Sequence, residues 1–305
     1  MRAMTKWIVI LSAFVLSGGA GAAEPTAQKA FGTPEEAVKE LVATAKANDV
    51  RAMLAVLGAD AAGVVFSGDP AEDRATFERF AKAYDEANRI DRQGDAKAVL
   101  SVGKDDWPLP FPLVKAKSGW QFDTKQGREE VIRRRIGRNE LSVMQAMQAY
   151  VDAQQEYYQR NPGNAKLLHY AQKVTSSKGK RDGLYYPTKE GEPPSPLGAL
   201  FASAQATGRA PDAGGKPVPY HGYVFRILAG QGPDAKGGAY DYIVRGTMIG
   251  GFGLVAYPAI YGNSGVMTFI VNQEGIVHQK DLGSSTASVA GKMTKFNPDS
   301  TWKRN

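Results

Sequence analysis

The stretch Gly237–Gly283, GGAYDYIVRGTMIGGFGLVAYPAIYGNSGVMTFIVNQEGIVHQKDLG, decides the fold of the second half of the chain. Short runs of β-branched and aromatic residues alternate with glycine-containing turns, which is typical of strands joined by tight connections. From Tyr220 onward we expect five strands in one antiparallel meander. They lie within HGYVFRILAG, YDYIVRGTMIG, FGLVAYPAIYG, VMTFIVNQEG and IVHQKDL, and the later ASVAGKMTKF predicts a short closing helix.

The glycine-rich core of this stretch, IGGFG at 249–253, raises the question of a phosphate site. A dinucleotide-binding loop needs its glycines between a strand and a helix, so that backbone amides and the helix N-terminus meet the pyrophosphate. Here strand-like runs lie on both sides, and no helix is expected before Leu282. The pair Gly291-Lys292 is followed by Met293, where a phosphate loop requires a hydroxyl residue. We therefore predict that these glycines turn and bulge a sheet, and we expect no cofactor.

A long helix, roughly Lys125–Tyr158, is expected before this sheet, with Gly137 as a candidate break. Two adjacent stripes run along it, which indicates a helix covered on more than one side. One stripe is Leu141, Met144, Gln148, Val151, Gln155 and Tyr158, and the other is Val143, Met147, Tyr150 and Tyr157. Glutamates four residues before the arginine cluster at 133–135 favour a solvated helix face over a polyanion site. Residues 126–305 are thus expected to form one domain, a long helix packed on an antiparallel sheet.

Between the long helix and the sheet, AKLLHYAQKVTS at 165–176 predicts a short helix. The following KGKRDGLYYPTKEGEPPSPLG at 178–198 is dense in glycine and proline and predicts either a long ordered loop or a flexible cover. The aromatic pair Tyr185-Tyr186 indicates that this loop docks on a core.

The first half, residues 30–125, predicts a small α+β domain. TPEEAVKELVATAKAND begins with Thr33 as a helix cap, Pro34 in the first turn and Glu36 three residues after the cap. VRAMLAVLG predicts a second helix ending at Gly58, and ATFERFAKAYDEANR predicts a third. AKAVLSVG and FPLVKAKSGWQFDT then predict strands. This order resembles the cone-shaped fold named after nuclear transport factor two. The whole chain is therefore expected to be α+β with two domains.

The N-terminus, MRAMTKWIVILSAFVLSGGAGAAEPTAQ, has the layout of a signal peptide. A short cationic segment is followed by an apolar run that is well short of the ~20 residues of a membrane-spanning helix, and then by small residues. We expect residues 1–23 to be removed on export to the periplasm through a Sec-type route, leaving no transmembrane segment. The chain has no cysteine, so its core alone must hold the exported fold, and thiolate catalysis and cysteine zinc sites are excluded.

Charge points to the envelope rather than to nucleic acid. Removing residues 1–23 takes away Arg2 and Lys6 and no acidic residue, so the formal charge falls from +7 to +5. This mild excess is spread along the chain and suits anionic lipid headgroups or cell-wall polymers. We expect no nucleic-acid partner.

Several long strings identify a family resemblance. DGLYYPTKEGEPPSPLGAL, YHGYVFRIL, the stretch from Gly238 to Gly283 and RIGRNELSVMQAMQAYVDAQQEYY together resemble the bacterial envelope family known as domain of unknown function 2950. This resemblance covers nearly all of the mature chain and implies no catalytic residues. The second half is also similar to the globular part of pseudopilins, through AYVDAQQEYY, FGLVAYP and FIVNQEGIVHQKDLG, although the prepilin cleavage motif is missing.

Residue types with chemistry give few candidates. The histidines His169, His221 and His278 have no ligand neighbour at metal-site spacing, and no serine lies in a G-x-S-x-G motif. We therefore predict no catalytic residue and no metal. Binding candidates are Asp182, Tyr185, Tyr186 and His221, because the tyrosines could stack on a sugar or peptide and His221 lies among aromatic residues. If Asp182 approached His221, an acid–base pair would result.

These observations favour an exported, non-enzymatic protein that binds or scaffolds in the cell envelope. Its expected partner is another envelope protein, a glycan or a small ligand. Two alternatives stay open: a periplasmic hydrolase acting on cell-wall or sugar substrates through Asp182 and His221, and an accessory subunit of a secretion or envelope complex.

Overall fold

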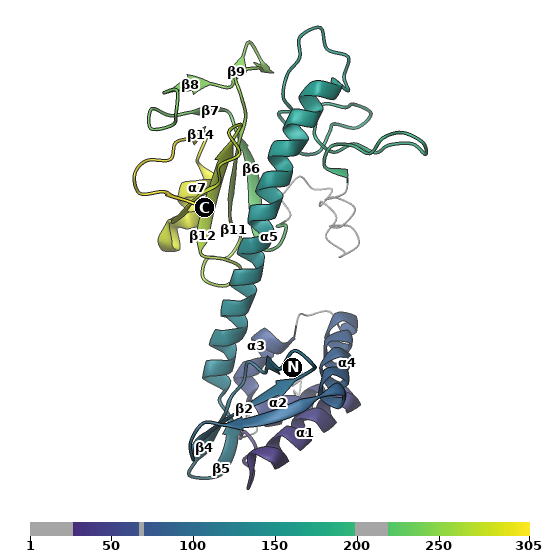
Figure 1. Ribbon diagram of the computed structural model, residues 1–305, viewed down its shortest axis with the longest axis vertical. Coiled ribbons are helices and arrows are strands. Elements are labelled where there is room, and N and C mark those ends of the chain that lie inside the picture. The colour runs from purple at the N-terminus through teal and green to yellow at the C-terminus, as the bar shows by residue number, and fades with distance from the viewer. Residues whose placement is uncertain (1–26, 67–69, 199–218) are drawn as a thin grey trace, which may run out of the picture. The chain divides into compact units, whose positions relative to one another are not determined.

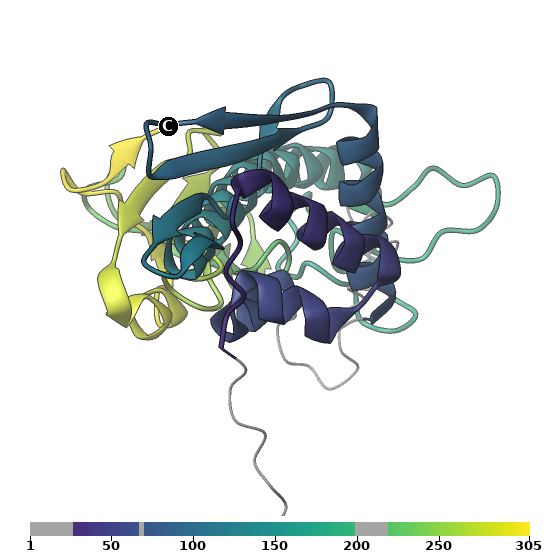
Figure 2. The same cartoon turned by 90° about the horizontal axis from the view of Figure 1, so that it is seen from below.

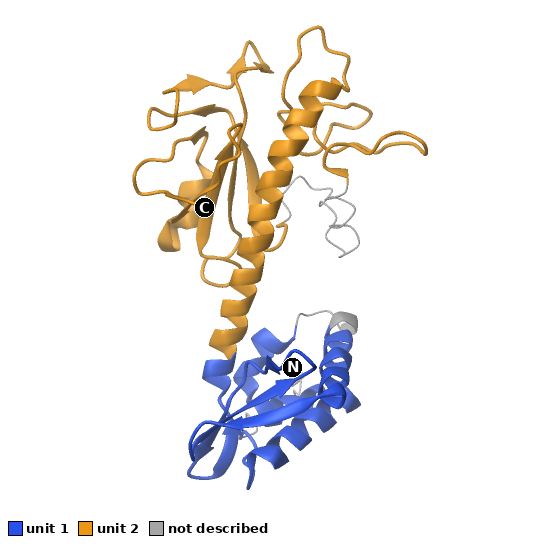
Figure 3. Cartoon of the chain, in the orientation of Figure 1, with its two compact units in different colours: residues 1–127 blue, residues 128–305 orange. Residues whose placement is uncertain are grey.

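The chain folds into two compact units, residues 1–127 and 128–305 (Figure 3). The computed structural model describes residues 27–66, 70–198 and 219–305, so the expected signal peptide at 1–23 lies outside the described residues. Both units combine helices with antiparallel sheets. The predicted α+β class with two domains is confirmed.

In unit 1, helices occupy the first part of the described chain. α1 (Pro34–Ala47) begins as predicted, because the Thr33 hydroxyl accepts from the backbone N–H of Glu36 at 3.2 Å. The Glu36 carboxylate reaches back to the N–H of Gly32, the residue before the cap, at 2.9 Å, which holds the chain at the start of the helix. α2 (Val50–Leu57) ends at Gly58 as predicted. η1 (Ala59–Ala61), α3 (Ala62–Val65) and α4 (Pro70–Glu86) follow.

The sheet of unit 1 has the order β1-β2-β4-β5, with β3 paired to β2. The strands are β1 (Asn88–Arg92), β2 (Lys97–Val102), β3 (Trp107–Pro108), β4 (Leu113–Ala116) and β5 (Gly119–Phe122). Figure 2 shows α1, α2 and α4 on one side of the strands. Leu100, Leu113 and Phe122 are fully buried in the unit.

The helix α5 (Thr124–Arg160), which belongs to unit 2 from Arg128 onward, runs without interruption, so the predicted break at Gly137 is wrong. An exposed glycine weakens a helix by only about 0.5–1 kcal/mol, which the packing of the rest of α5 outweighs. The stripe of Val143, Met147, Tyr150 and Tyr157 is buried as core. The other predicted stripe is only partly covered, because Leu141 is 61% exposed.

The main sheet of unit 2 has the order β15-β13-β12-β11-β6 and is antiparallel throughout. Its strands are β6 (Tyr223–Leu228), β11 (Gly253–Pro258), β12 (Met267–Asn272), β13 (His278–Asp281) and β15 (Lys303–Arg304). α5 lies along one face of this sheet (Figure 1), where Leu254, Ala256 and Phe269 join its buried stripe in one core cluster. The opposite face packs against α7 (Thr286–Gly291), through Val255, Ile270 and Ala290.

The segment YDYIVRGTMIG does not supply a strand of this sheet, which corrects the predicted meander. Its residues form β8 (Tyr240–Asp241), β9 (Ile243–Val244) and β10 (Thr247–Met248). β8 joins a small sheet with β7 (Gly230–Gln231) and β14 (Lys295–Phe296), while β9 and β10 pair with each other. The fifth strand of the main sheet is β15 instead, from the end of the chain.

The glycines of IGGFG shape backbone, as predicted. They connect β10 to β11, with strands on both sides. Gly251 has a φ of +144°, and a Cβ at Gly250 would stand 2.8 Å from the carbonyl oxygen of Asp241. Phe252, in the middle, is fully buried.

No helix forms at 165–176, so that prediction is wrong. The backbone of this segment forms hydrogen bonds with other parts of the chain instead. The N–H of Tyr170 donates to the C=O of Met248, and the C=O of Val174 accepts from the N–H of Tyr185. The loop that follows docks on the core as predicted, with Leu184 and Tyr186 buried.

Candidate functional site

Helix α4 of unit 1 borders two hollows, one on each of two adjacent faces. The first, which we call the Trp107 hollow, has a volume of about 550 Å³ and lies between α4 and the β2–β3 connection. Its apolar lining includes Phe80, Val102, Trp107 and Leu109, and its charged lining is Arg79, Glu86, Lys104 and Asp105. Trp107 is 58% exposed. An aromatic ring of this size at the surface of an open hollow is a contact area for a ligand.

The β2–β3 connection is fixed to the C-terminal end of α4. The N–H of Gly103 donates to the carbonyl oxygens of Ala83 and Ala87, at 3.0 and 2.8 Å, and so satisfies carbonyls near the helix end. Gly103 has a φ of +77° and Asp106 one of +50°, both of which suit a tight turn. Val102 then pairs with Trp107 across the hairpin. This turn therefore sets the position of Trp107 relative to α4.

The charges around the Trp107 hollow are mixed. Arg79 and Lys104 supply two cations, and Glu86 and Asp105 supply two carboxylates. Arg79 donates to the hydroxyl of Thr76 at 2.8 Å, one turn earlier on α4. A ligand with an apolar face and charged groups of both signs would find complementary groups here.

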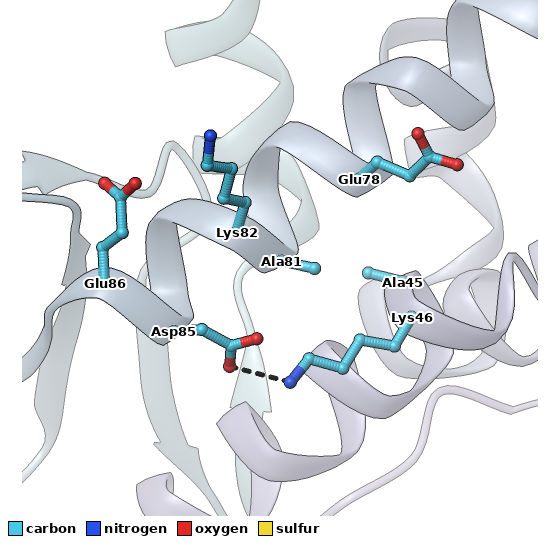
Figure 4. Close-up of a pocket in the computed structure, with 7 residues that line it drawn as sticks. All are labelled: Ala45, Lys46, Glu78, Ala81, Lys82, Asp85 and Glu86. Atoms are coloured by element: carbon cyan, nitrogen blue, oxygen red, sulfur yellow. Dashed lines mark hydrogen bonds and ion pairs between the residues drawn. The ribbon is translucent and has the colours of Figure 1, made fainter.

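The second hollow, of about 590 Å³, lies between α1 and α4. Ala45 and Ala81 are its small residues, and Lys46 and Asp85 form an ion pair of 2.7 Å between the two helices (Figure 4). Both ionic side chains are about half exposed, so this pair contributes little to stability. Glu86 lines both hollows.

Asp182, a binding candidate from the sequence, lies in unit 2 and is held by its own loop. Its carboxylate accepts from the Lys173 ammonium at 2.8 Å, from the Ser177 N–H at 2.7 Å and from the Ser177 hydroxyl at 3.0 Å. The Lys173 hydrogen bond, helped by the Ser177 bonds, holds the pKa of Asp182 well below its usual range. None of its hydrogen bonds goes to His221. Asp182 therefore stabilises the conformation of its loop, and it does not form a pair with His221.

Tyr185 and Tyr186 lie on the same loop. Tyr186 is buried, and the guanidinium of Arg181 lies 5.1 Å from the centre of its ring. Arg181 also pairs with Glu192 at 2.8 Å. Tyr185 is partly buried against the core cluster of unit 2. These tyrosines hold the loop to the core, and Tyr186 offers a ligand little surface.

His221 lies at the start of the strand-rich segment, with a φ of +47°. Its half-buried ring makes an edge contact with Tyr220, with centroids 4.3 Å apart. His169 packs against Tyr157 and His278 against Phe296, and burial lowers the pKa of both histidines. Within residues 27–66, 70–198 and 219–305, no group of three or more His, Asp or Glu residues could hold a metal ion.

Sequence reasoning missed the Trp107 hollow. Asp105 and Asp106 lie in the exposed turn between β2 and β3. The signal was the residue after the turn, a tryptophan in a two-residue strand whose residues are both exposed. On α4, Phe77 is buried, whereas Phe80 lines the hollow.

Comparison with known proteins gives a family and no relative of known activity. A family model described as "Protein of unknown function (DUF2950)" matches residues 28–305. No curated protein and no solved structure matches the chain. In the described part of the chain, no helix has the length and apolar character needed to cross a membrane.

Proposed function

Because the chain belongs to the DUF2950 family, whose activity is not defined, we propose a function from the site itself: binding of a cell-wall glycan fragment in the Trp107 hollow. The protein is in this proposal an exported, non-enzymatic component of the bacterial envelope. Residues 1–23 direct it to the periplasm, where such fragments occur.

The observation that carries this proposal is the exposed Trp107 beside charges of both signs. The flat ring of a tryptophan packs against the C–H face of a sugar, which is an apolar contact made without desolvating charge. Peptide stems on cell-wall glycans carry carboxylates and amines. Arg79 and Lys104 suit the carboxylates, and Glu86 and Asp105 suit the amines. The hollow is open, so it fits one part of a longer polymer.

The hydrolase alternative has less support. It required Asp182 and His221 to act together, whereas the hydrogen bonds of Asp182 go to Lys173 and Ser177. A binding function needs no such pair.

The proposal is tested by titrating the mature protein with a disaccharide–tetrapeptide fragment of peptidoglycan in a calorimeter. We expect Trp107→Ala to weaken binding at least tenfold and Trp107→Phe to weaken it less, because Phe keeps a flat ring. Ile260→Ala is the matched control, since Ile260 is 59% exposed but lies in unit 2. Equal binding by the wild type and by Trp107→Ala, or no binding by the wild type, would reject the proposal.

A further inference from the structure

β6 is an edge strand of the main sheet of unit 2, and part of its outer edge is unpaired. On its inner side β6 pairs with β11, from Tyr223 opposite Pro258 to Leu228 opposite Gly253. On its outer side, no further strand of the described chain joins the five-stranded sheet. Unpaired strand edges present backbone donors and acceptors to any extended chain that reaches them.

Alternation along β6 identifies the free groups. In an antiparallel pair, successive residues direct their backbone groups to opposite edges. Tyr223 bonds outward, because its N–H and C=O pair with Tyr220. Ala229 also bonds outward, to the C=O of Thr294 and the N–H of Tyr242. Phe225 and Ile227 lie between these two residues at two-residue spacing. Their backbone N–H and C=O groups therefore also face the outer edge of β6.

No described residue hydrogen-bonds to the outward groups of Phe225 and Ile227. Two N–H donors and two C=O acceptors are thus available in a row. The strand is also incompletely covered, since the four residues from Val224 to Ile227 are all only partly buried. A partner strand would satisfy these four groups and cover the partly exposed side chains.

The two faces of β6 define what such a strand would carry. Phe225 and Ile227 lie on the α5 face, where they pack against the edge of the core cluster. Arg226 points to the opposite face, where its guanidinium donates to the carbonyl oxygen of Gly291 in α7. A neighbouring strand would place apolar side chains beside Phe225 and Ile227, and the residue between them beside Arg226.

We infer that this edge binds an extended peptide of another protein, with an acidic residue between two apolar ones. A backbone in β conformation is the chemistry that matches two donors and two acceptors along a strand, as in other cases of strand addition. A second copy of this chain fits less well. Antiparallel pairing of two β6 strands about a two-fold axis at Arg226 sets the two arginines directly opposite each other, and like charges in that position are destabilising.

The probe is a capped seven-residue peptide, Ser-Thr-Val-Glu-Val-Thr-Ser, labelled for fluorescence anisotropy with the mature protein. A second peptide has lysine in place of the glutamate. We expect the glutamate peptide to bind wild type at least tenfold more tightly than the lysine peptide. Arg226→Glu should reverse this preference, which no loss of folding can imitate.

Proline substitutions test the edge itself. Ile227→Pro removes an outward N–H and no bond of the β6–β11 ladder, so the protein should stay folded while peptide affinity falls at least tenfold. Arg226→Pro removes an inward N–H opposite Val255 and should lower the thermal midpoint. Absence of binding to wild type, unchanged binding by Ile227→Pro, or an unreversed preference in Arg226→Glu would overturn the inference. So would a concentration-dependent dimer that Ile227→Pro abolishes, because the occupant would then be a second copy.

Discussion

Gln154 and Ala171 are joined by two hydrogen bonds that imitate a strand pair. The side-chain oxygen of Gln154 accepts the Ala171 N–H at 2.9 Å, and its side-chain NH₂ donates to the Ala171 C=O at 2.9 Å. The same NH₂ donates to the Tyr150 hydroxyl, which donates in turn to the C=O of Gly253. Both Gln154 and Ala171 are completely buried. One α5 side chain thus supplies both partners for the backbone of a loop residue.

Gln154→Leu should destabilise unit 2. It leaves the N–H and C=O of Ala171 buried without partners, at a cost of about 2 kcal/mol or more. Amide hydrogen exchange of residues 165–176 should accelerate at least tenfold. Gln148→Leu is the control. It removes a hydrogen bond of the same length, 2.9 Å from the Gln148 side chain to the C=O of Gly275, but at an exposed position. Similar effects of the two substitutions would show that burial does not set the cost.

Two glycines of α5 should respond to alanine with opposite signs. Gly137 is exposed and has open space around it, so Gly137→Ala should stabilise the helix by about 0.5–1 kcal/mol. A Cβ at Gly127 would overlap the ring of Phe111, so Gly127→Ala should destabilise unit 1 by about 1–3 kcal/mol. Urea unfolding of both variants measures the two effects. Stabilisation by Gly127→Ala would mean that Phe111 moves aside at no cost.

Asp182 should make its loop sensitive to acid. Its pKa is held below the usual value of about 4, chiefly by Lys173, so the charged form is the one that stabilises the fold. The stabilisation is therefore present above about pH 4 and is lost as the pH falls through the lowered pKa. Lys173→Met should raise that pKa, as followed through the Ser177 amide by NMR titration. Lys178→Met should not, because the hydrogen bond comes from Lys173. Equal midpoints in wild type and Lys173→Met would contradict this assignment.

Local signals predicted much of the fold. The cap at Thr33, the end of α2 at Gly58 and the buried stripe of α5 depend on neighbouring residues, and each is present. The predictions failed where the structure of a segment depends on contacts with residues that are distant in the sequence. Residues 165–176 have a helical composition, yet they form no helix, because their backbone bonds to Gln154 and to the C=O of Met248. β-propensity at 240–250 was real, but it does not specify which sheet a strand joins.

The candidate site was less predictable than the fold. Residue type alone identified the four candidates Asp182, Tyr185, Tyr186 and His221. In the structure Asp182 bonds to Lys173, and the Tyr186 ring contacts the Arg181 guanidinium. The Trp107 hollow needed knowledge of which side chains stay uncovered, which periodicity on α4 alone does not give. The similarity of residues 126–305 to pseudopilins stays a prediction.

β15 pairs with β13, so residues 303–305 cover the outer edge of β13 in the main sheet. Lys303 and Arg304 line up with Gln279 and His278, and the N–H of Asn305 donates to the C=O of Val277. Deleting residues 303–305 would expose the outer edge of β13 and leave the main sheet with unpaired backbone groups on both sides.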